Sequence, residues 1–355
     1  MATDPAFWRG KRVLLTGHTG FKGSWAALWL SRMGAEVTGF ALSPERQPAL
    51  FDLIDIGARS IIGDLADPDA VKSAVAEAAP EIVLHLAAQP LVRRSYREPV
   101  ETFRTNVMGT VHLLDAVGPG ARVILVITTD KVYENDERGQ AFKEGDRLGG
   151  HDPYAASKAC AEIAVQSYRR SFLAEREARI ATARGGNVIG GGDFSEDRLV
   201  PDIIRAALAG EALALRNPHA TRPWQHVLDC LDGYFTYAQA LWDGDAPDSL
   251  NIGPHDPADT MTVAEVAGAM ARALGATDGW RHDQAEAPHE MSALALDPTL
   301  ARQALGWQGR LNSADAIRLT ADWYGAWANG ADMTGFTQDQ IAVYQTLTPM
   351  HEAAL

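Results

Sequence analysis

The chain has 355 residues, of which 46% are hydrophobic and 22% charged, as expected for a globular protein of one or two domains. Its net charge of -14 argues against broad binding to nucleic-acid or membrane phosphates, so neither partner is expected. Its two cysteines lack CxxC spacing and its ten histidines form no ligand pattern, so neither a disulfide framework nor a metal site is expected.

The first residues, 1–12, contain no apolar core of the kind that a signal peptide needs. No later segment approaches the ~18 uninterrupted apolar residues of a membrane-spanning helix. A cytoplasmic location is therefore expected.

Short apolar runs then alternate with amphipathic stretches, which predicts strands alternating with helices. The runs are rich in Val, Ile and Leu at consecutive positions, as is typical of parallel strands covered on both faces. The predicted strands are residues 12–16, 36–41, 60–62, 82–86, 122–128 and 178–184, and the predicted helices are residues 21–33, 68–78, 99–117 and 153–175. We expect an α/β fold with a Rossmann-type doubly wound parallel sheet.

Beyond Gly185 the composition changes, and Gly, Pro, Arg and Trp become frequent. Helices are predicted at residues 199–209, 227–242, 263–274 and 314–328, separated by long irregular stretches. This pattern indicates a smaller, mixed α/β C-terminal domain. We expect residues 1–185 to form the Rossmann domain and residues 186–355 mainly the substrate domain, with some segments returning to the sheet.

The first predicted strand runs into the loop GHTGFKG (residues 17–23), and an apolar helix follows at once. Gly17 permits the tight turn, Gly20 lets a pyrophosphate approach the backbone, and Gly23 lets the helix pack close to the strand. The free N–H groups at the helix start favour phosphates. A glycine-rich turn without a ligand is the alternative, but the strand–loop–helix context supports the motif. We expect a dinucleotide to contact Gly17, Thr19, Gly20, Phe21, Lys22 and Gly23.

The identity of the dinucleotide is less sharply marked, because the usual acidic residue directly after the second strand is missing. Ser43 is placed to bind the ribose, whereas Arg46 would tolerate a 2′-phosphate. NAD is therefore the expected cofactor, and NADP stays open. Later segments are expected to line the cofactor through a carboxylate for the adenine and small residues for close approach: Asp64, Leu65, Leu86, Ala87 and Ala88.

Tyr154 and Lys158 lie four residues apart near the start of a predicted helix, so they share one face. A lysine there places positive charge near the phenol and lowers its pKa, so that tyrosinate takes a hydroxyl proton as hydride leaves carbon. The same spacing also occurs on ordinary exposed helices. Here it follows a fifth strand, at the carboxyl edge where such sheets hold ligands. We predict that both residues contact the cofactor and carry a redox step.

Together these features resemble the extended short-chain dehydrogenase/reductase family over nearly the whole chain. Within that family, TDKVY (residues 129–133) looks like the signature of the nucleotide-sugar 4,6-dehydratases, which carry Thr-Asp-Glu or, in one branch, Thr-Asp-Lys. The lysine form is similar to the branch that acts on CDP-glucose. Further matches to that branch are residues 17–23, 184–193, 197–202 and 216–227. The resemblance implies a lyase that uses NAD.

The implied reaction oxidises C4 of the glucose ring, which acidifies the C5 proton; water then leaves across C5 and C6, and the hydride returns to C6. Tyr154 and Lys158 would carry the hydride step, with Thr129 holding the C4 oxygen. Asp130 is the expected general acid at C6, provided that its pKa is raised. Lys131 is the expected base at C5, which requires a neutral amine. A role for Lys131 in orienting water or the sugar stays open.

Residues 184–226 supply cations and turns that suit a nucleoside diphosphate. Arg198, Arg216 and Arg222 are candidates for charge-assisted pairing with the pyrophosphate, although each also fits an ordinary surface ion pair. Asn251 looks like the end of the family's strand beside the nucleotide. The expected contacts of the CDP-glucose substrate are Gln89, Asn187, Asp193, Arg198, Leu199, Val200, Arg216, Arg222 and Asn251.

Other functions share parts of this pattern. Another nucleotide-sugar 4,6-dehydratase, or a 4-epimerase of the same family, is the nearest alternative, but an epimerase needs no acid–base pair after the threonine. A dinucleotide-sensing regulatory protein usually lacks the Tyr–Lys pair. The resemblance also implies a homodimer through a four-helix bundle, or a higher oligomer, and the alanine-rich residues 155–164 suit close helix approach.

Overall fold

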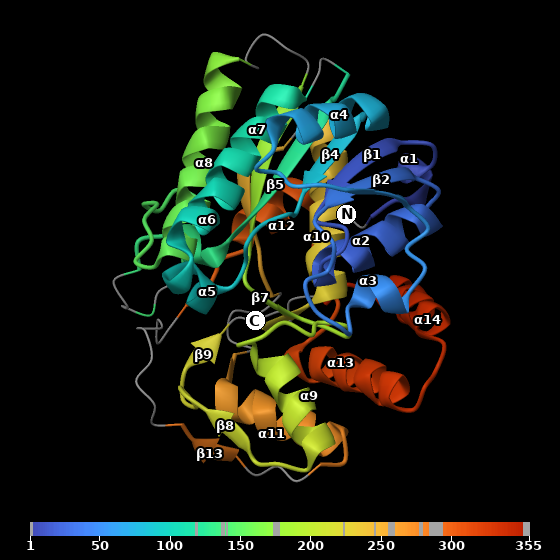
Figure 1. Cartoon of the computed structure of the whole chain (residues 1–355), viewed down its shortest axis with the longest axis vertical. Helices are drawn as coiled ribbons and strands as arrows, with labels where there is room; N and C mark the ends of the chain where they lie inside the picture. Colours follow the sequence, from blue (N-terminus) through green and yellow to red (C-terminus); the bar gives the residue numbers. More distant parts are fainter. Residues whose placement is uncertain are drawn as a thin grey trace.

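The computed structural model describes residues 3–117, 120–135, 139, 141–172, 178–222, 224–244, 246–254, 260–276, 280–283 and 294–350. Within these residues seven parallel strands form one sheet in the order β11-β6-β5-β4-β1-β2-β3 (Figure 1). They are β1 (Arg12–Thr16), β2 (Glu36–Ala41), β3 (Arg59–Ile62), β4 (Ile82–His85), β5 (Val123–Thr129), β6 (Arg179–Gly185) and β11 (Ser249–Ile252). The chain order reverses between β3 and β4, which opens a crevice at the carboxyl ends of β1 and β4. The predicted Rossmann-type sheet is confirmed.

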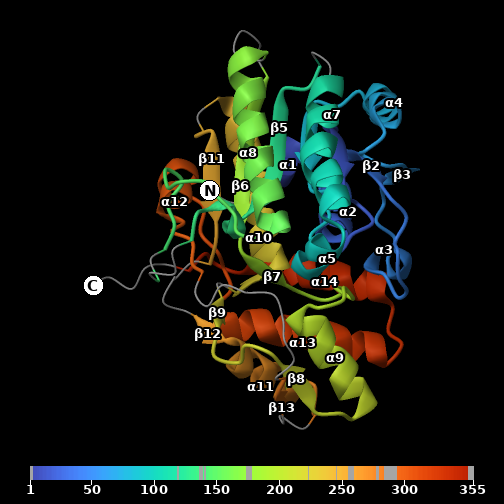
Figure 2. The same cartoon turned by 60° about the vertical axis from the view of Figure 1, so that its left-hand side comes forward.

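Both faces of this sheet are covered by helices, which explains the continuous apolar runs. Helices α4 (Pro68–Ala78), α7 (Gly109–Ala116) and α8 (Pro153–Ser171) lie on one face, while α2 (Phe21–Arg32) and α10 (Val227–Asp243) lie on the other (Figure 2). Successive side chains of β1 alternate between the two cores: Leu14 joins the first, and Val13 and Leu15 join the second.

A smaller lobe lies beyond the carboxyl edge of the sheet (Figure 1). It contains α9 (Leu199–Ala209) and α11 (Val263–Ala273), with the short strand pair β8 (Leu213–Leu215) and β13 (Trp280–His282). Further short strands of the described chain are β7 (Asn187–Ile189), β9 (Thr221–Arg222), β10 (Trp224–His226) and β12 (Met261–Thr262). The chain enters the lobe more than once, and between its lobe segments it returns to the sheet through α10 and β11. The lobe is therefore fastened to the sheet at several points.

The remaining helices of the described residues are short or peripheral. They are α1 (Pro5–Trp8), α3 (Leu50–Leu53), α5 (Val92–Arg97), α6 (Pro99–Phe103), α12 (Thr299–Leu305), α13 (Ser313–Ala328) and α14 (Met333–Thr346). Of these, the sequence pattern predicts α13 and, within a longer helix, α6. Within the described ranges, no helix combines the length and apolar character that crossing a bilayer requires.

The predicted helix at residues 99–117 differs from the structure in its middle. There α6 passes into a π-helical turn, η1 (Arg104–Met108), before α7 begins. Asn106 in this turn is buried; its amide accepts the N–H of Gln89 at 2.8 Å and donates to Ser157 Oγ at 2.9 Å. Such turns are frequent near functional sites. This one ties the segment after β4 to helix α8.

Helix α8 ends at Ser171, whereas the sequence places its end near Glu175. Residues 173–177 lie outside the described part of the chain, as does Pro223 of the matched segment 216–227. Strand β5 extends one residue further than predicted, through Thr129. The catalytic candidates that follow therefore begin directly at the strand end.

Candidate active site

A cavity of about 530 Å³ lies at the carboxyl edge of the sheet, between the sheet and the smaller lobe. Strands β5 and β6 reach it from the sheet, and β7 and α9 reach it from the other side. The structure brings many of the predicted site residues to its wall: Phe21, Lys22, Leu86, Ala88, Thr129, Asp130, Lys131, Tyr154, Lys158, Asn187, Asp193, Arg198, Leu199, Val200, Arg216 and Arg222.

The three glycines of the loop after β1 are needed for different reasons, two for the fold itself and one for a ligand. Gly17 has φ +81°, and a Cβ there would lie 2.8 Å from the Ala87 backbone nitrogen. A Cβ on Gly23 would clash with the Gly17 carbonyl oxygen. Gly20 is different, because the nearest atom to a Cβ there is 3.4 Å away. The fold itself requires Gly17 and Gly23, whereas the lack of a side chain at Gly20 leaves space at the backbone for a ligand.

Helix α2 begins directly after Gly20, and within the described residues no side chain caps its first turn. Its N-terminal amides are thus available to a phosphate. The loop therefore fits the pyrophosphate of a dinucleotide such as NAD.

The residues expected around the adenosine lie near this loop but outside the cavity wall. Ser43 is exposed, and Asp64 accepts the backbone N–H of Ala66 at 2.9 Å. Leu65 is buried in the core, and the hydroxyl of Thr19 donates to the Leu42 carbonyl at 2.8 Å. The hydroxyl and carboxylate that would bind the ribose and adenine remain predictions.

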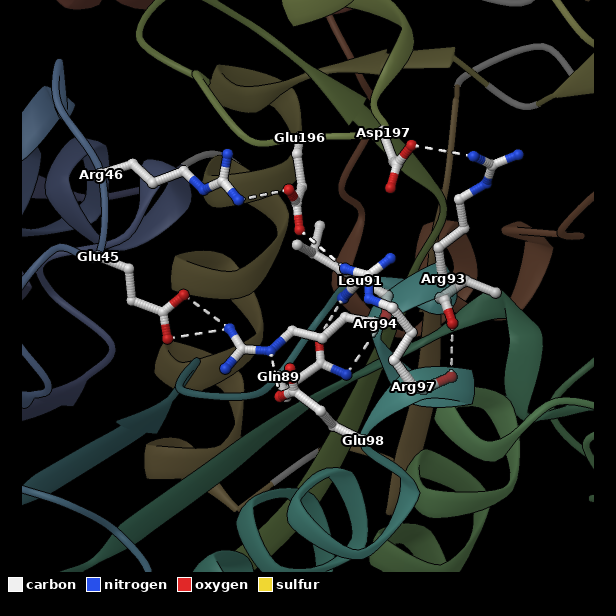
Figure 3. A network of polar contacts seen from close by, with 12 residues as sticks. Glu45, Arg46, Gln89, Leu91, Arg93, Arg94, Arg97, Glu98, Glu196 and Asp197 are labelled. Atoms are coloured by element: carbon white, nitrogen blue, oxygen red, sulfur yellow. Dashed lines mark hydrogen bonds and ion pairs between the residues drawn. The ribbon is translucent and has the colours of Figure 1, made fainter.

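Ion pairs join the loop after β2, helix α5 and the loop between β7 and α9 (Figure 3). Glu196 accepts from Arg46 at 2.5 Å and from Arg97 at 3.1 Å. Arg94 pairs with both carboxylate oxygens of Glu45, at 2.7 and 2.9 Å. The structure thus gives Arg46 a carboxylate partner in place of the 2′-phosphate considered for it.

Lys158 and Tyr154, the residues expected to carry the hydride step, both have shifted pKa values. Lys158 is buried, and its Nζ donates to the Ile127 carbonyl at 2.8 Å. Burial, with the nearby charge of Lys22, lowers the pKa of Lys158 to about 8. Burial raises the pKa of Tyr154 to about 12, although a hydrogen bond with Thr129 and the charge of Arg198 act in the opposite direction. The phenol is therefore protonated in the ligand-free protein.

The acid–base pair occupies a single turn, η2 (Asp130–Val132), directly after β5. The hydroxyl of Thr129 donates to Asp130 Oδ1 at 2.9 Å, while buried Oδ2 finds no hydrogen-bond partner among the described residues. Burial raises the pKa of Asp130, against the opposing charge of Lys131. Asp130 is thus a buried carboxyl whose pKa is shifted in the direction that a general acid needs, and it lines the same cavity as Tyr154.

Two arginines on opposite sides of the cavity share one carboxylate oxygen. Asp197 Oδ1 lies 3.2 Å from Arg93 Nη1 (Figure 3) and 3.8 Å from Arg216 Nη1. Arg93 Nε and Arg216 Nη1 are buried and have no hydrogen-bond partner within the described ranges. Buried guanidinium donors without acceptors fit an anionic ligand. The sequence analysis missed Arg93, because nothing local marks the short helix α5 as a site element.

Two predicted substrate residues lie away from the cavity wall in the described structure. Gln89 is buried, and its side chain donates to Thr102 Oγ1 at 2.9 Å. Asn251 is fully buried, and its side chain accepts from the Tyr133 hydroxyl at 2.7 Å. Both residues connect segments of the fold through these hydrogen bonds. Within the described residues, no group of three or more His, Cys, Asp or Glu side chains is arranged to hold a metal ion.

Comparisons with known proteins add an independent line of evidence. Residues 13–253 match the NAD dependent epimerase/dehydratase family. The chain is 42% identical to a CDP-glucose 4,6-dehydratase of Salmonella typhimurium, over 97% of this chain and 99% of that protein. It is 32% identical to a dTDP-glucose 4,6-dehydratase of Streptomyces antibioticus, over 74% of this chain and 75% of that protein. The solved UDP-glucose 4-epimerase of Thermus thermophilus, in complex with NAD, has a TM-score of 0.75 at 27% identity, over 87% of this chain and 97% of that one.

The glycine loop yields a test of the cofactor site. Gly20→Ala is expected to keep or slightly raise the thermal unfolding midpoint, since its φ of -83° suits alanine. The same variant should bind NAD at least about tenfold more weakly, because the methyl group fills the phosphate approach. Gly23→Ala should lose roughly 2 kcal/mol or more of stability through its backbone clash. Scanning calorimetry and NAD titration of both variants check this, and wild-type NAD affinity in Gly20→Ala would contradict it.

Proposed function

Since the chain belongs to the NAD dependent epimerase/dehydratase family, we propose that it is a CDP-glucose 4,6-dehydratase, a lyase that forms CDP-4-dehydro-6-deoxy-D-glucose. The observation that carries the proposal is a buried Asp130 followed by Lys131 on the cavity wall that also holds Tyr154 and Lys158. Redox chemistry alone needs only the last two residues. An acid–base pair beside them fits the loss of water.

The first half of the reaction removes the C4 hydroxyl proton and the C4 hydride. NAD, held at the glycine loop, supplies the hydride chemistry. Tyr154 takes the proton, with Thr129 binding the same oxygen. The ammonium of Lys158, fixed to the Ile127 carbonyl, stands one helical turn from Tyr154 and favours the tyrosinate. We assign residues 1–185 to this cofactor half and residues 186–355 mainly to the nucleotide sugar.

The second half expels the C6 hydroxyl. The new C4 ketone acidifies the C5 proton, which we assign to Lys131 as base. Asp130 then protonates the leaving hydroxyl, since burial raises the pKa of its carboxyl and its Oδ2 has no hydrogen-bond partner within the described residues. The proton passes to the departing C6 oxygen, so Asp130 becomes a carboxylate as the C6–O bond breaks and water leaves. The hydride would then return to C6 and a proton to C5, which gives the product.

The nucleoside diphosphate is assigned to the arginines of the cavity wall. Arg198, Arg216 and Arg222 line the cavity, and Arg93 joins them from helix α5. The buried nitrogens Arg93 Nε and Arg216 Nη1, which have no hydrogen-bond partner within the described residues, support this assignment. CDP is preferred over other nucleotides because of the 42% identity with the Salmonella enzyme.

A 4-epimerase is the second candidate, because an epimerase of the same fold matches 87% of the chain. Its chemistry returns the hydride to C4 and needs no proton donor at C6. The buried acid Asp130 has no task in that reaction, so the dehydratase is favoured.

We also propose a homodimer. Helices α6 and α8 lie side by side, and their outer surface carries exposed apolar side chains. Val100, Phe103 and Met108 come from α6 and η1, and Ile163 comes from α8. Val100 is 80% exposed and Ile163 56% exposed, which is unusual for a solvated helix face. Pairing this face with its counterpart in a second copy produces a four-helix bundle.

The proposed reaction predicts net redox neutrality with CDP-glucose. With deuterium at C4 of the substrate, mass spectrometry of the product should show the loss of water and retention of the label, now at C6. The enzyme should accumulate no stoichiometric NADH. Retention of all the oxygen atoms in the product, with inversion at C4, would identify an epimerase instead.

The two halves of the reaction should separate in single-turnover experiments. Lys131→Ala should still oxidise C4, so the absorbance of reduced nicotinamide should rise and persist. Tyr154→Phe should show little absorbance change, with C4 oxidation slowed by about 10²–10⁴-fold, because the C4 proton has no acceptor. Dehydration by Lys131→Ala at the wild-type rate would remove Lys131 from the base role.

The dimer is tested by light scattering at micromolar concentration. The wild-type protein should have twice the mass of the 38.2 kDa chain. Ile163→Asp should shift the protein toward monomer, because it places a charge in the apolar interface. Leu208→Asp is the matched control, since Leu208 is similarly exposed on α9 but lies on the other lobe. A monomeric wild type would refute the proposal.

A further inference from the structure

A buried ion pair joins two of the elements that border the candidate active site. Glu162 on α8 and Arg184 on β6 have side chains that are 1% and 2% exposed, and Arg184 Nη2 donates to Glu162 Oε2 at 2.8 Å. Arg184 Nε donates to the other oxygen, Oε1, at 3.0 Å, which completes a planar fork. The hydroxyls of Thr128 and Thr182 also donate to this carboxylate. All four residues lie on β5, β6 or α8, the elements that border the catalytic candidates.

The remaining nitrogen of the guanidinium points to a different segment. Arg184 Nη1 donates to the Tyr133 hydroxyl at 2.8 Å and to the Glu144 carbonyl at 3.0 Å. The Tyr133 hydroxyl donates onward to Asn251 Oδ1 at 2.7 Å. The Tyr133 ring stacks on Phe142, with centroids 4.8 Å apart. Tyr133, the first residue after the η2 turn, is therefore fixed by its ring and by its hydroxyl.

This placement removes Tyr133 from the cavity. It is 1% exposed, and burial raises the pKa of its phenol to about 12. With both hydroxyl interactions used, Tyr133 is poorly suited to proton transfer with substrate. Its position in the TDKVY segment, two residues after Lys131, is therefore better explained by a role other than proton transfer.

Stability alone is a weak explanation for the charged pair. Burying two charges costs desolvation energy that their attraction often only balances, and apolar residues of similar volume usually stabilise a core as well. A bidentate fork does something that apolar packing does not: it fixes the orientation of three segments at once. Here those segments are α8, β6 and the chain that leaves η2.

We propose that Arg184 and Tyr133 are positioning residues that hold the Asp130–Lys131 turn in register with the helix carrying Tyr154 and Lys158. Glu162 stands one helical turn after Lys158, and Tyr133 stands two residues after Lys131. Arg184 connects the two side chains directly. The inference rests on the proposed function, because it assigns the elimination step to the turn.

The hydride pair has anchors of its own. Lys158 is held by the Ile127 carbonyl, and the Tyr154 backbone N–H donates to Ser95 Oγ at 3.2 Å. The Asp152 side chain caps the start of α8. Loss of the Tyr133 hydroxyl should therefore displace the elimination residues while the oxidation residues stay in place.

Tyr133→Phe tests this, because it deletes only the hydroxyl and keeps the ring that stacks on Phe142. In a single turnover with CDP-glucose, C4 oxidation should proceed at the wild-type rate. Formation of dehydrated product should slow by about 10²-fold, as expected for a misplacement of catalytic groups by about 1 Å. Reduced nicotinamide should accumulate transiently, and the KM for CDP-glucose should be unchanged. Arg184→Lys, which keeps the charge and loses the fork, should show the same division.

Tyr344→Phe is the matched control. Tyr344 is equally buried, and its hydroxyl donates to a carboxylate oxygen of Asp229 at 2.7 Å, far along the chain on α14. It should lower thermal stability without any accumulation of reduced nicotinamide. Equal slowing of both half-reactions in Tyr133→Phe, or kinetics like those of Tyr344→Phe, would overturn the inference. A wild-type protein that releases no dehydrated product would overturn the proposed function, and the inference with it.

Discussion

Complete burial of strand β5 is the constraint on which the site depends. Every residue from Val123 to Thr129 is buried, because helices cover both faces of the sheet and strands flank both edges of β5. Such a strand can present chemistry only where it ends. The η2 turn, with Asp130 and Lys131, begins at the next residue, and α8 packs against both the strand and the turn. The topology thus places an acid, a candidate base and the Tyr–Lys pair around one cavity before any specific contact is considered.

Burial also shifts the pKa values of three site residues, each toward the neutral form of the side chain. It raises the pKa of Asp130 and of Tyr154, and it lowers that of Lys158. Each shift favours the neutral form, because a charge loses its hydration in the cavity wall. Smaller differences in pKa between these groups make it easier for protons to leave one ring position and arrive at another.

Local sequence signals predicted the parts of the fold that depend on local periodicity. The strands β1 to β6 and helices such as α2, α4 and α9 follow from apolar runs and helical spacing. Helix α14 gives no such signal, because its buried face includes Thr337 and Gln340 as well as Ile341. The catalytic segment, residues 129–133, could be predicted from the sequence because its residues are neighbours in the chain. The partners of Arg184 could not be predicted, since Glu162 and Tyr133 meet it only when the strands and α8 assemble.

The same distinction explains where the expected substrate residues lie. Asn251 lies in β11 and Gln89 in the segment after β4, but a sequence does not show which way a polar side chain points at such an edge. Asn251 bonds to the Tyr133 hydroxyl and the Phe142 carbonyl, and Gln89 bonds to Thr102 and Leu91, so both are held by other segments of the fold. Arg93 does line the cavity, although no sequence signal marked it, because it lies on α5, a short arginine-rich helix without an apolar stripe. Its partner Asp197 and the adjacent Glu196 belong to one loop, which therefore contacts both Arg93 and, through Arg46, the loop after β2. Exposed ion pairs of this kind contribute only about 0–1 kcal/mol each. Their main effect here is therefore geometric: they align the cofactor side and the substrate side of the cavity on helix α5.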